Sequence, residues 1–292
     1  MKRLFSILVL VSSATAYGWQ AGWTTMPAVE LQEHSTAKPS AVPLAPPEKA
    51  AQPAENRART IINQAIEALG GQAYLTIRDR EIRGRVYSFH LGRPNGSGGL
   101  FWSFSEFPDK ERIELTQERD VAELFVGNKG YEITYKGVKA QEKKDLEDYL
   151  RRRHYSLDAV LRTWINEPGV ILLFEGNAIA AQHPALQVTV INSQNESVTL
   201  YFDADTHLPV KRSFEWRDPV DRQKNLEEEV YENYRPVSGI MAPYNITRFF
   251  NGDMSNQRFL NSVTINQGLD QTMFDPNSGY KPILDEKSKN KR

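Results

Sequence analysis

The chain of 292 residues contains no cysteine and carries almost no net charge. The missing cysteine excludes disulfide bonds, thiolate zinc sites, cysteine nucleophiles and lipid attachment through an N-terminal cysteine. A formal net charge of −1 provides no overall basic field, so we expect no nucleic-acid partner. Because 40% of the residues are hydrophobic and 25% are charged, the composition is that of a folded protein rather than a disordered or membrane-spanning one.

The sequence motifs of common enzymes are also missing. There is no G-x-S-x-G, no H-E-x-x-H, no phosphate-binding glycine loop and no dinucleotide fingerprint. The histidines are scattered along the chain, at His34, His90, His154, His183 and His207. Asp203 and Asp205 resemble half of a calcium loop, but the glycine and the distal glutamate of an EF-hand are missing, so we interpret them as turn residues. We expect a protein without catalytic activity, cofactor or metal, with a secreted hydrolase of unrecognised site as the alternative.

The first sixteen residues have the pattern of a signal peptide. Lys2 and Arg3 are followed by the apolar residues 4–11 and by the small residues Ala14 and Ala16. The alternative is a buried N-terminal helix, but the apolar run is far shorter than the about 20 residues that span a bilayer. We predict cleavage after Ala16, a periplasmic or secreted protein, and no transmembrane segment in the mature chain.

Composition separates three further segments. Residues 17–53 contain six of the chain's 16 prolines, interleaved with Ala, Ser, Thr and Gln, which predicts a disordered linker. Residues 281–292 are rich in lysine and predict a basic, disordered tail. We expect the remaining residues, 54–280, to form one domain.

Two segments of this domain have helical periodicity. Ile61, Ile62, Ala65, Ile66 and Leu69 form one apolar stripe, which the glycines at 70 and 71 end. A second helix is predicted between residues 141 and 166, where an apolar face recurs at helical spacing before the Pro-Gly pair at 168 and 169. Its first half, residues 142–153, is highly charged, so we expect it to lie on the surface.

Nearly everything else in the domain alternates with period two between turn signals. This pattern predicts about eleven strands, near residues 79–90, 99–107, 109–116, 121–126, 131–136, 170–175, 185–193, 197–203, 208–217, 227–249 (as two) and 257–266. Short connections favour antiparallel pairing. We predict an α+β, mainly β domain in which two main helices form a lid over the concave face of one curved antiparallel sheet.

Large apolar side chains on this sheet and on the second helix fit either a filled core or a pocket for an apolar ligand. The candidate ligand-binding residues are Trp102, Phe104, Leu161, Trp164, Phe202, Phe214 and Trp216. For any one of them, a place in the core is the simpler interpretation. Sequence patterns leave both alternatives open.

Two charged runs have two interpretations each. Glu227, Glu228 and Glu229 form either a carboxylate cluster or a solvated strand edge, and we favour the edge. The basic run at residues 151–154 either meets anionic lipid headgroups or belongs to a helix surface, and we favour the surface.

Several segments resemble the periplasmic lipoprotein-carrier superfamily, of the LolA and LolB type. They read A-L-G-G at 68–71, F-P-D-K-E-R at 107–112, V-G-N-K-G-Y at 126–131 and L-Y-F-D-A-D-T-H-L-P-V at 200–210. Residues 231–243, Y-E-N-Y-R-P-V-S-G-I-M-A-P, and 263–276, V-T-I-N-Q-G-L-D-Q-T-M-F-D-P, are similar to the C-terminal strands of such proteins. The likeness spans about residues 56–276 and identifies the chain as a divergent exported member.

This resemblance implies an unclosed β-barrel with a helical lid over an apolar cavity, and a lipid or an acylated protein as ligand. We therefore expect a non-catalytic, periplasmic binding or carrier protein for an apolar or lipidated ligand, similar to those that sort outer-membrane lipoproteins. The alternative is an envelope-stress sensor or regulatory protein that uses the same fold to bind a protein or lipid partner in the envelope.

Overall fold

The computed structural model describes residues 54–278. The predicted signal peptide, linker and basic tail lie outside the described residues. The helices are α1 (Ala54–Leu69), α2 (Gln72–Leu75), α3 (Lys143–His154) and α4 (Leu157–Arg162), with the 3-10 turns η1 (Trp164–Asn166), η2 (Gln271–Phe274) and η3 (Pro276–Ser278). The strands are β1 (Asp79–His90), β2 (Arg93–Pro94), β3 (Gly99–Glu106), β4 (Lys110–Leu115), β5 (Val121–Val126), β6 (Lys129–Thr134), β7 (Gly137–Ala140), β8 (Ile171–Ala180), β9 (His183–Ile191), β10 (Ser197–Asp203), β11 (Pro209–Arg217), β12 (Lys224–Val237), β13 (Ile240–Phe250) and β14 (Asp253–Ile265).

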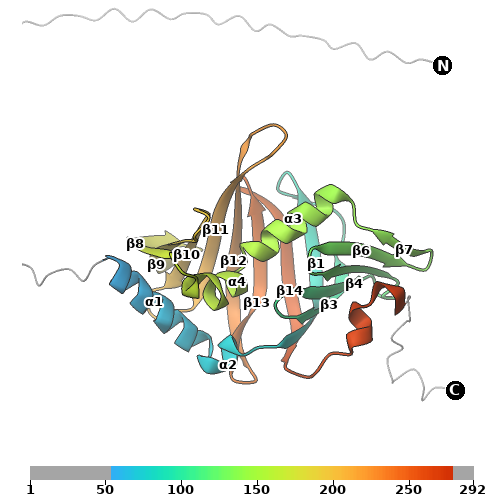
Figure 1. Cartoon of the computed structure of the whole chain (residues 1–292), viewed down its shortest axis with the longest axis horizontal. Coiled ribbons are helices and arrows are strands. Elements are labelled where there is room, and N and C mark those ends of the chain that lie inside the picture. Colours follow the sequence, from blue (N-terminus) through green and yellow to red (C-terminus); the bar gives the residue numbers. More distant parts are fainter. Residues whose placement is uncertain (1–53, 279–292) are drawn as a thin grey trace, which may run out of the picture. The chain divides into compact units, whose positions relative to one another are not determined.

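These strands form one antiparallel sheet in the order β7-β6-β5-β4-β3-β1-β14-β13-β12-β11-β10-β9-β8, with β2 paired to the end of β1. The first long strand, β1, pairs with the last, β14, near the middle of the sheet. The chain therefore runs outward from β1 to one edge at β7 and returns from the other edge at β8 (Figure 1). The two edges remain unpaired with each other, so the sheet is unclosed.

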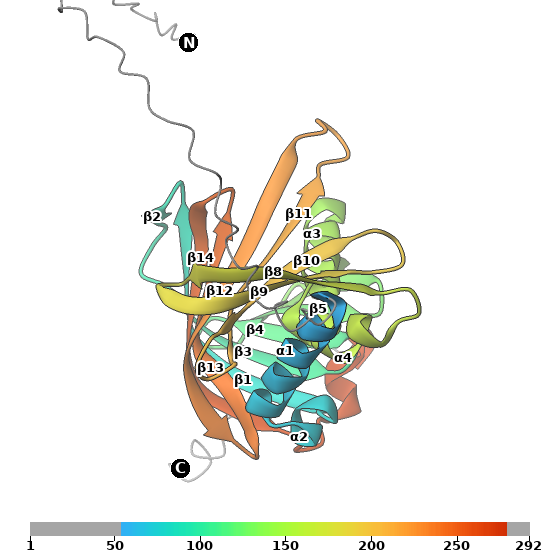
Figure 2. The same cartoon turned by 90° about the vertical axis from the view of Figure 1, so that its left-hand side faces the viewer.

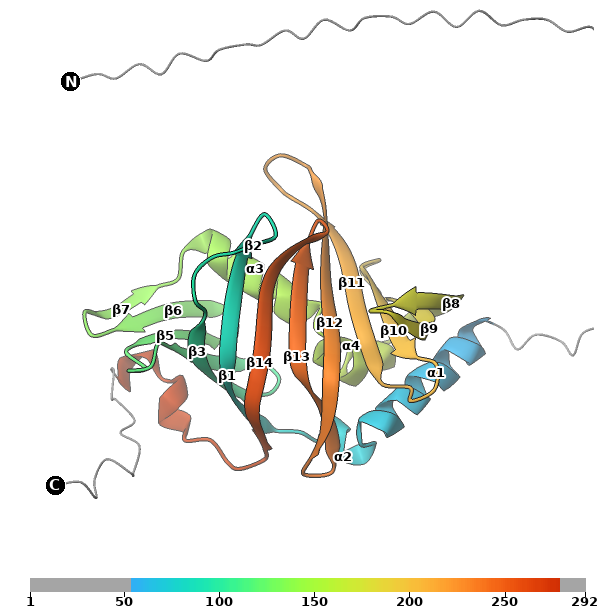
Figure 3. The same ribbon diagram turned by 180° about the vertical axis from the view of Figure 1, so that it is seen from behind.

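This topology places the second helical region over one face of the sheet. Because β7 and β8 are at opposite edges, the chain between them must cross a whole face, and α3, α4 and η1 make that crossing. Figure 1 shows α3 and α4 in front of the strands, and Figure 3 shows the other face, where the central strands have no helix over them. The covered face is the concave one.

The sheet curves and twists strongly. Register shifts interrupt the ladders between β1 and β14, β8 and β9, β10 and β11, and β13 and β14. Such bulges bend a strand and increase its twist. At the β1 bulge, Gly84 is required because a Cβ atom there would lie 2.4 Å from the backbone oxygen of Phe259. Figure 2, which looks from the β8 edge, shows how far β8 and β9 have turned relative to β13 and β14.

The single curved antiparallel sheet and the mainly β composition are confirmed, but the expected number of strands is wrong. The sheet has 14 strands rather than about eleven. The predicted ranges, with 227–249 counted as two, correspond to twelve of them. The two strands that the pattern missed are β2, which has only two residues, and β7, whose four residues are all exposed. Neither buries a face, so neither leaves an alternating pattern in the sequence.

The first helix ends at Leu69, before Gly70, as its apolar stripe predicted. The region at 141–166, expected as one helix, is divided into α3, α4 and η1. The division follows from Ser156, whose hydroxyl oxygen accepts a hydrogen bond from the backbone N–H of Ala159 at 3.2 Å. A serine at this position starts a new helix.

The main hydrophobic core lies between the concave face and the helices α1 and α4. Ala58, Ile62 and Ala65 of α1 are completely buried, and α1 contacts β8 and β13. A second, smaller cluster lies on the opposite face of the sheet, where Phe104, Leu124 and Ile133 pack with Phe274 of η2. Thus β3, β5 and β6 are covered on both faces.

Candidate functional site

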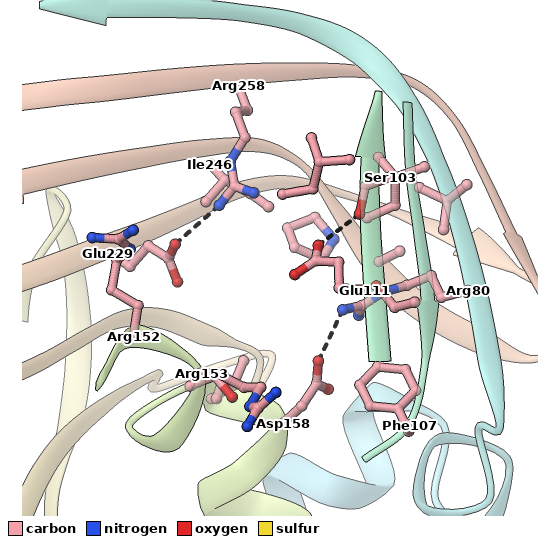
Figure 4. A pocket seen from close by; sticks show the side chains of 18 of the residues that line it. Arg80, Ser103, Phe107, Glu111, Arg152, Arg153, Asp158, Glu229, Ile246 and Arg258 are labelled. Atoms are coloured by element: carbon pink, nitrogen blue, oxygen red, sulfur yellow. Dashed lines mark hydrogen bonds and ion pairs between the residues drawn. The ribbon is translucent and has the colours of Figure 1, made fainter. Parts of the chain in front are cut away.

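A cavity of about 720 Å³ lies between the concave face and the helices α3 and α4. Strands β1, β3, β4, β5, β12, β13 and β14 contribute to its wall, and α3 and α4 contribute to its cover. Its lining is amphipathic, because aliphatic and aromatic side chains alternate with arginines and carboxylates. Figure 4 shows the charged side chains pointing toward the cavity from the sheet and from the helices.

The apolar part of the lining is continuous with the main core. Ile77, Phe101, Ile240, Leu260 and Val263 line the cavity and also belong to the core cluster. On β13 and β14, the half-buried Ile246 and the buried Leu260 place aliphatic surface beside polar residues of the same strands. The cavity therefore begins where the helices stop filling the concave face.

Two carboxylates connect the helical cover to the sheet. Asp158 of α4 accepts hydrogen bonds from the Tyr74 hydroxyl at 3.1 Å and from Nη2 of Arg80 at 3.0 Å. Glu111 of β4 accepts from the Ser103 hydroxyl at 2.7 Å and from the Tyr149 hydroxyl of α3 at 2.9 Å. These hydrogen bonds attach α4 to β1 and α3 to β4.

Glu229 of β12 is the centre of a buried charge cluster. Its carboxylate accepts from Nε of Arg248 at 2.6 Å, Nη2 of Arg258 at 3.1 Å, Nη2 of Arg212 at 3.0 Å and the hydroxyl of Tyr231 at 2.8 Å. Burial alone would raise the pKa of Glu229, but Arg248, Arg212 and Arg258 together hold it well below its usual range. Glu229 is therefore ionised at neutral pH and shares one negative charge among three guanidinium groups.

The opposite wall of the cavity carries carboxylates instead. Burial, followed by repulsion from Asp145 and Glu111, raises the pKa of Glu123 on β5. Asp145 and Asp148 of α3 line the cavity as well. The cavity consequently has an electrostatic polarity, with arginines toward β12–β14 and carboxylates toward β5.

The seven residues expected to bind an apolar ligand lie elsewhere. Leu161, Trp164, Phe202 and Phe214 belong to the main core, with 0–3% of their surface exposed, and Trp216 packs at its border. Trp102 and Phe104 lie on the opposite face of the sheet, in the smaller cluster. None of the seven lines the cavity, so ligand contact at these positions stays an untested prediction.

Strand alternation explains the difference at β3. Phe101, Ser103 and Ser105 face the cavity, so the alternate residues Trp102 and Phe104 face the other side. The larger apolar side chains made the even-numbered face look like the inner one. In fact both faces of β3 are covered, and the cavity is on the face with the two serines.

Glu229 and Arg152 belong to the two charged runs for which the sequence favours a solvent-exposed position. The solvated-edge interpretation of the glutamate run is wrong, because β12 is an interior strand between β11 and β13 and Glu229 is only 6% exposed. The basic run of α3 is only partly a surface, since Arg152 and Arg153 line the cavity. The signal that could have identified both was a charge cluster on each of two elements that meet in space.

Within residues 54–278, no group of three or more His, Asp or Glu side chains is arranged to hold a metal ion. In the same part of the chain, every helix is too short or too polar to cross a membrane.

No family model and no curated protein matches the sequence. Among solved structures, the fold is similar to a DUF1329 family protein from Desulfovibrio piger, with a TM-score of 0.53 and 11% identity over 75% of this chain and 97% of that one. It is also similar to a putative outer membrane lipoprotein-sorting protein domain from Vibrio parahaemolyticus, with a TM-score of 0.50 and 13% identity over 75% and 98% of the two chains. A LolA superfamily protein from Nitrosomonas europaea aligns over 75% and 97% of the two chains, at 13% identity and a TM-score of 0.48. The expected resemblance is therefore confirmed at the level of the fold: the chain shares its architecture with the Desulfovibrio piger and Vibrio parahaemolyticus structures, in a divergent sequence.

Proposed function

We propose that this protein is an exported binding or carrier protein that holds an apolar or lipidated ligand in the cavity under α3 and α4. The observation that carries the proposal is the cavity of about 720 Å³, which lies on the concave face and has a partly apolar lining. Its volume falls within the range of about 300–1,000 Å³ that is typical of small-molecule sites. The function is binding without catalysis, in the periplasm or outside the cell.

The energetics of such binding come from the hydrophobic effect. Transfer of an acyl chain from water to an apolar environment is worth about 0.8 kcal/mol per methylene. The apolar residues of β13 and β14, among them Ile246 and Leu260, offer a surface along which such a chain can lie. A carrier of this kind needs no covalent bond to its ligand.

The helix α3 suits the role of a movable lid. None of its residues is buried, and polar contacts attach it to the sheet. Besides the Tyr149–Glu111 bond, Nη1 of Arg153 donates to the backbone oxygen of Asp109 at 3.1 Å. Few buried apolar contacts make an element easy to open. We infer that α3 moves when the ligand enters and leaves.

The fold comparison supports the same class of function. The Vibrio parahaemolyticus domain is described as a putative outer membrane lipoprotein-sorting protein. By analogy, the ligand of this chain belongs to the lipids or to acylated proteins of the envelope. Fold likeness is compatible with many ligands, so the experiment below does not presuppose one.

The test is native mass spectrometry of the mature protein from residue 17, purified from the periplasm without detergent, followed by solvent extraction. We expect a stoichiometric lipid or lipopeptide adduct that the solvent removes. Ile246→Trp, which places an indole in the cavity, should reduce the adduct. Phe250→Trp, on the same strand but outside the cavity lining, should leave it unchanged.

An unliganded mass that persists after addition of lipid and of acylated peptide would contradict the proposal. If a protein partner is then retained on gentle purification, the envelope-sensor alternative is the better description. An adduct that is equally abundant in both tryptophan variants would show that the ligand lies outside this cavity.

A further inference from the structure

Three arginines gather at the cavity wall toward β12–β14, where only one carboxylate of residues 54–278 is bonded to them directly. Arg248, Arg258 and Arg152 line the cavity there. Glu229 is the carboxylate that Arg248 and Arg258 contact, and it is also bonded to Arg212. Within the described residues, Glu229 is thus the only carboxylate hydrogen-bonded to the arginines of this wall (Figure 4).

Arg152 differs from Arg248 and Arg258 because no carboxylate within the described residues is bonded to it directly. Within residues 54–278 it makes no hydrogen bond and no ion pair, although it points into the cavity from α3. Of the carboxylates near Arg152, Asp148 and Glu227 are bound by Arg151 at 2.6 Å and 3.1 Å, and Glu123 attracts Arg152 without a hydrogen bond or ion pair. On Arg258, the Nε atom is buried and has no hydrogen-bond partner.

Burial, and after it the repulsion between these cations, lowers the pKa of two of the three arginines. Burial, followed by the charge of Arg248, lowers the pKa of Arg258 to about 10. Partial burial of its guanidinium group, followed by the charge of Arg248, also lowers the pKa of Arg152. An anion placed between these guanidinium groups would relieve the repulsion, since opposite charges stabilise the ionised form.

On β13 and on β14, an apolar residue and an arginine lie next to each other on the face that lines the cavity. Ile246 and Arg248 are two residues apart on β13, as Arg258 and Leu260 are on β14, so each pair shares a face of the sheet. The two strands also place Ile246 directly opposite Arg258. An apolar chain that lies along Ile246 and Leu260 therefore has its end beside the guanidinium groups.

We propose that the cavity binds an amphiphile with an oxyanion headgroup, which is seated between Arg152, Arg248 and Arg258 while its apolar chain lies along Ile246 and Leu260. This inference rests on the proposed function and names the chemical class of its ligand. Guanidinium groups bind phosphate and carboxylate oxygens through paired, charge-assisted hydrogen bonds. The carboxylates around Glu123 repel such a headgroup from the other wall and so set the orientation of the ligand.

The experiment compares two probes of equal chain length by isothermal titration below their micelle concentrations. Dodecyl phosphate carries the oxyanion, and 1-O-dodecylglycerol is neutral. Inorganic phosphate provides the headgroup without a chain. We expect dodecyl phosphate to bind on the order of tenfold more tightly than dodecylglycerol, and inorganic phosphate to bind far more weakly than dodecyl phosphate.

The variant Arg152→Gln removes a cation without breaking a hydrogen bond or an ion pair within the described residues. We expect its affinity for dodecyl phosphate to fall on the order of tenfold, with dodecylglycerol binding unchanged. Lys144→Gln is the matched control, because Lys144 is an exposed cation of the same helix outside the cavity lining. Arg152→Lys should recover part of the lost affinity. Glu123→Gln on β5 should not weaken the binding of dodecyl phosphate.

The outcomes separate this inference from the proposed function. Equal binding of both probes, unaffected by Arg152→Gln, would overturn the headgroup assignment and leave the carrier function intact. Binding of neither probe would contradict the carrier function and, with it, the inference. Inorganic phosphate that binds as tightly as dodecyl phosphate would show a site for the free anion, and would overturn the amphiphile as ligand.

Discussion

The helices α1 and α3 both lie over the concave face of one sheet, yet only one of them fills the space beneath it. α1 presents a stripe of Ala and Ile whose side chains are buried, and several of them, including Ala58 and Ile62, have no exposed surface. α3 has no buried residue, and its last turn contains three arginines and a histidine. Below α1 the molecule is a continuous core, and below α3 it is a cavity.

The strands beneath the two helices also differ in the polarity of their inward side chains. Val188, Val190 and Leu200 on β9 and β10 are completely buried in the main core. On β3 and β4 the inward positions include Ser103, Ser105 and Glu111 instead. The sheet topology thus provides a concave face, and the sequence of the crossing helix decides whether that face is filled.

The largest expected effect tests the filled region. Trp164, in the turn after α4, is 2% exposed and lies outside the cavity lining. Trp164→Glu leaves a void and buries an unpaired carboxylate, so we expect the free energy of unfolding to fall by about 3–5 kcal/mol. Urea unfolding followed by circular dichroism measures the change.

The control for this variant is Val220→Glu, which introduces the same charge at a side chain that is 91% exposed. It should change the stability by less than about 0.5 kcal/mol. If Trp164→Glu is as stable as the unmodified protein but loses ligand, this tryptophan belongs to the binding region and the division between filled and hollow halves is misplaced.

The sequence predicted the filled region better than the hollow one. The stripe of α1 and most strands could be recognised because burial on one face leaves a periodic pattern. The ranges 79–90, 121–126 and 197–203 agree with β1, β5 and β10 to the residue. Periodicity therefore predicts the elements correctly where each of them buries an apolar face.

The cavity could not be predicted in the same way, because its features arise from contacts between distant segments. Glu229 of β12 meets Arg258 of β14 across the intervening strand β13, and Glu111 meets Tyr149 from a helix 38 positions away. On β3 both faces carry apolar side chains, because η2 covers the outer face with a second apolar cluster. A local pattern cannot show which of two apolar faces lies inside.

The second prediction concerns the charge cluster at the border of the two regions. Glu229→Gln leaves the guanidinium groups of Arg212, Arg248 and Arg258 without their carboxylate. Removal of one partner from such a buried group is strongly destabilising, and we expect a loss of about 3 kcal/mol at pH 7. Chemical denaturation of both proteins across a pH series measures it.

The pH dependence of this effect has a defined sign. Because the pKa of Glu229 is held well below its usual range in the folded state, the unfolded chain takes up a proton first as the pH falls through about 4.3. The stabilisation is therefore fully present above that pH and is lost below it. The difference between the two proteins should shrink on acidification, and a constant or growing difference would contradict the assigned cluster.

The smallest effect belongs to the contact that holds α3 above the cavity. Tyr149 donates its hydroxyl to Glu111 at 2.9 Å, while its ring stacks on Phe125 with 3.5 Å between centroids. Tyr149→Phe keeps the ring contact and removes one hydrogen bond, so the expected loss of stability is about 1 kcal/mol. Tyr135→Phe is the matched control, since Tyr135 is 75% exposed. Hydrogen exchange should accelerate in α3 but not in α1, because α1 depends on apolar burial that this change does not reach. Equal acceleration in both helices would mean that they open as one unit, and the contrast between a fixed helix and a movable one would fail.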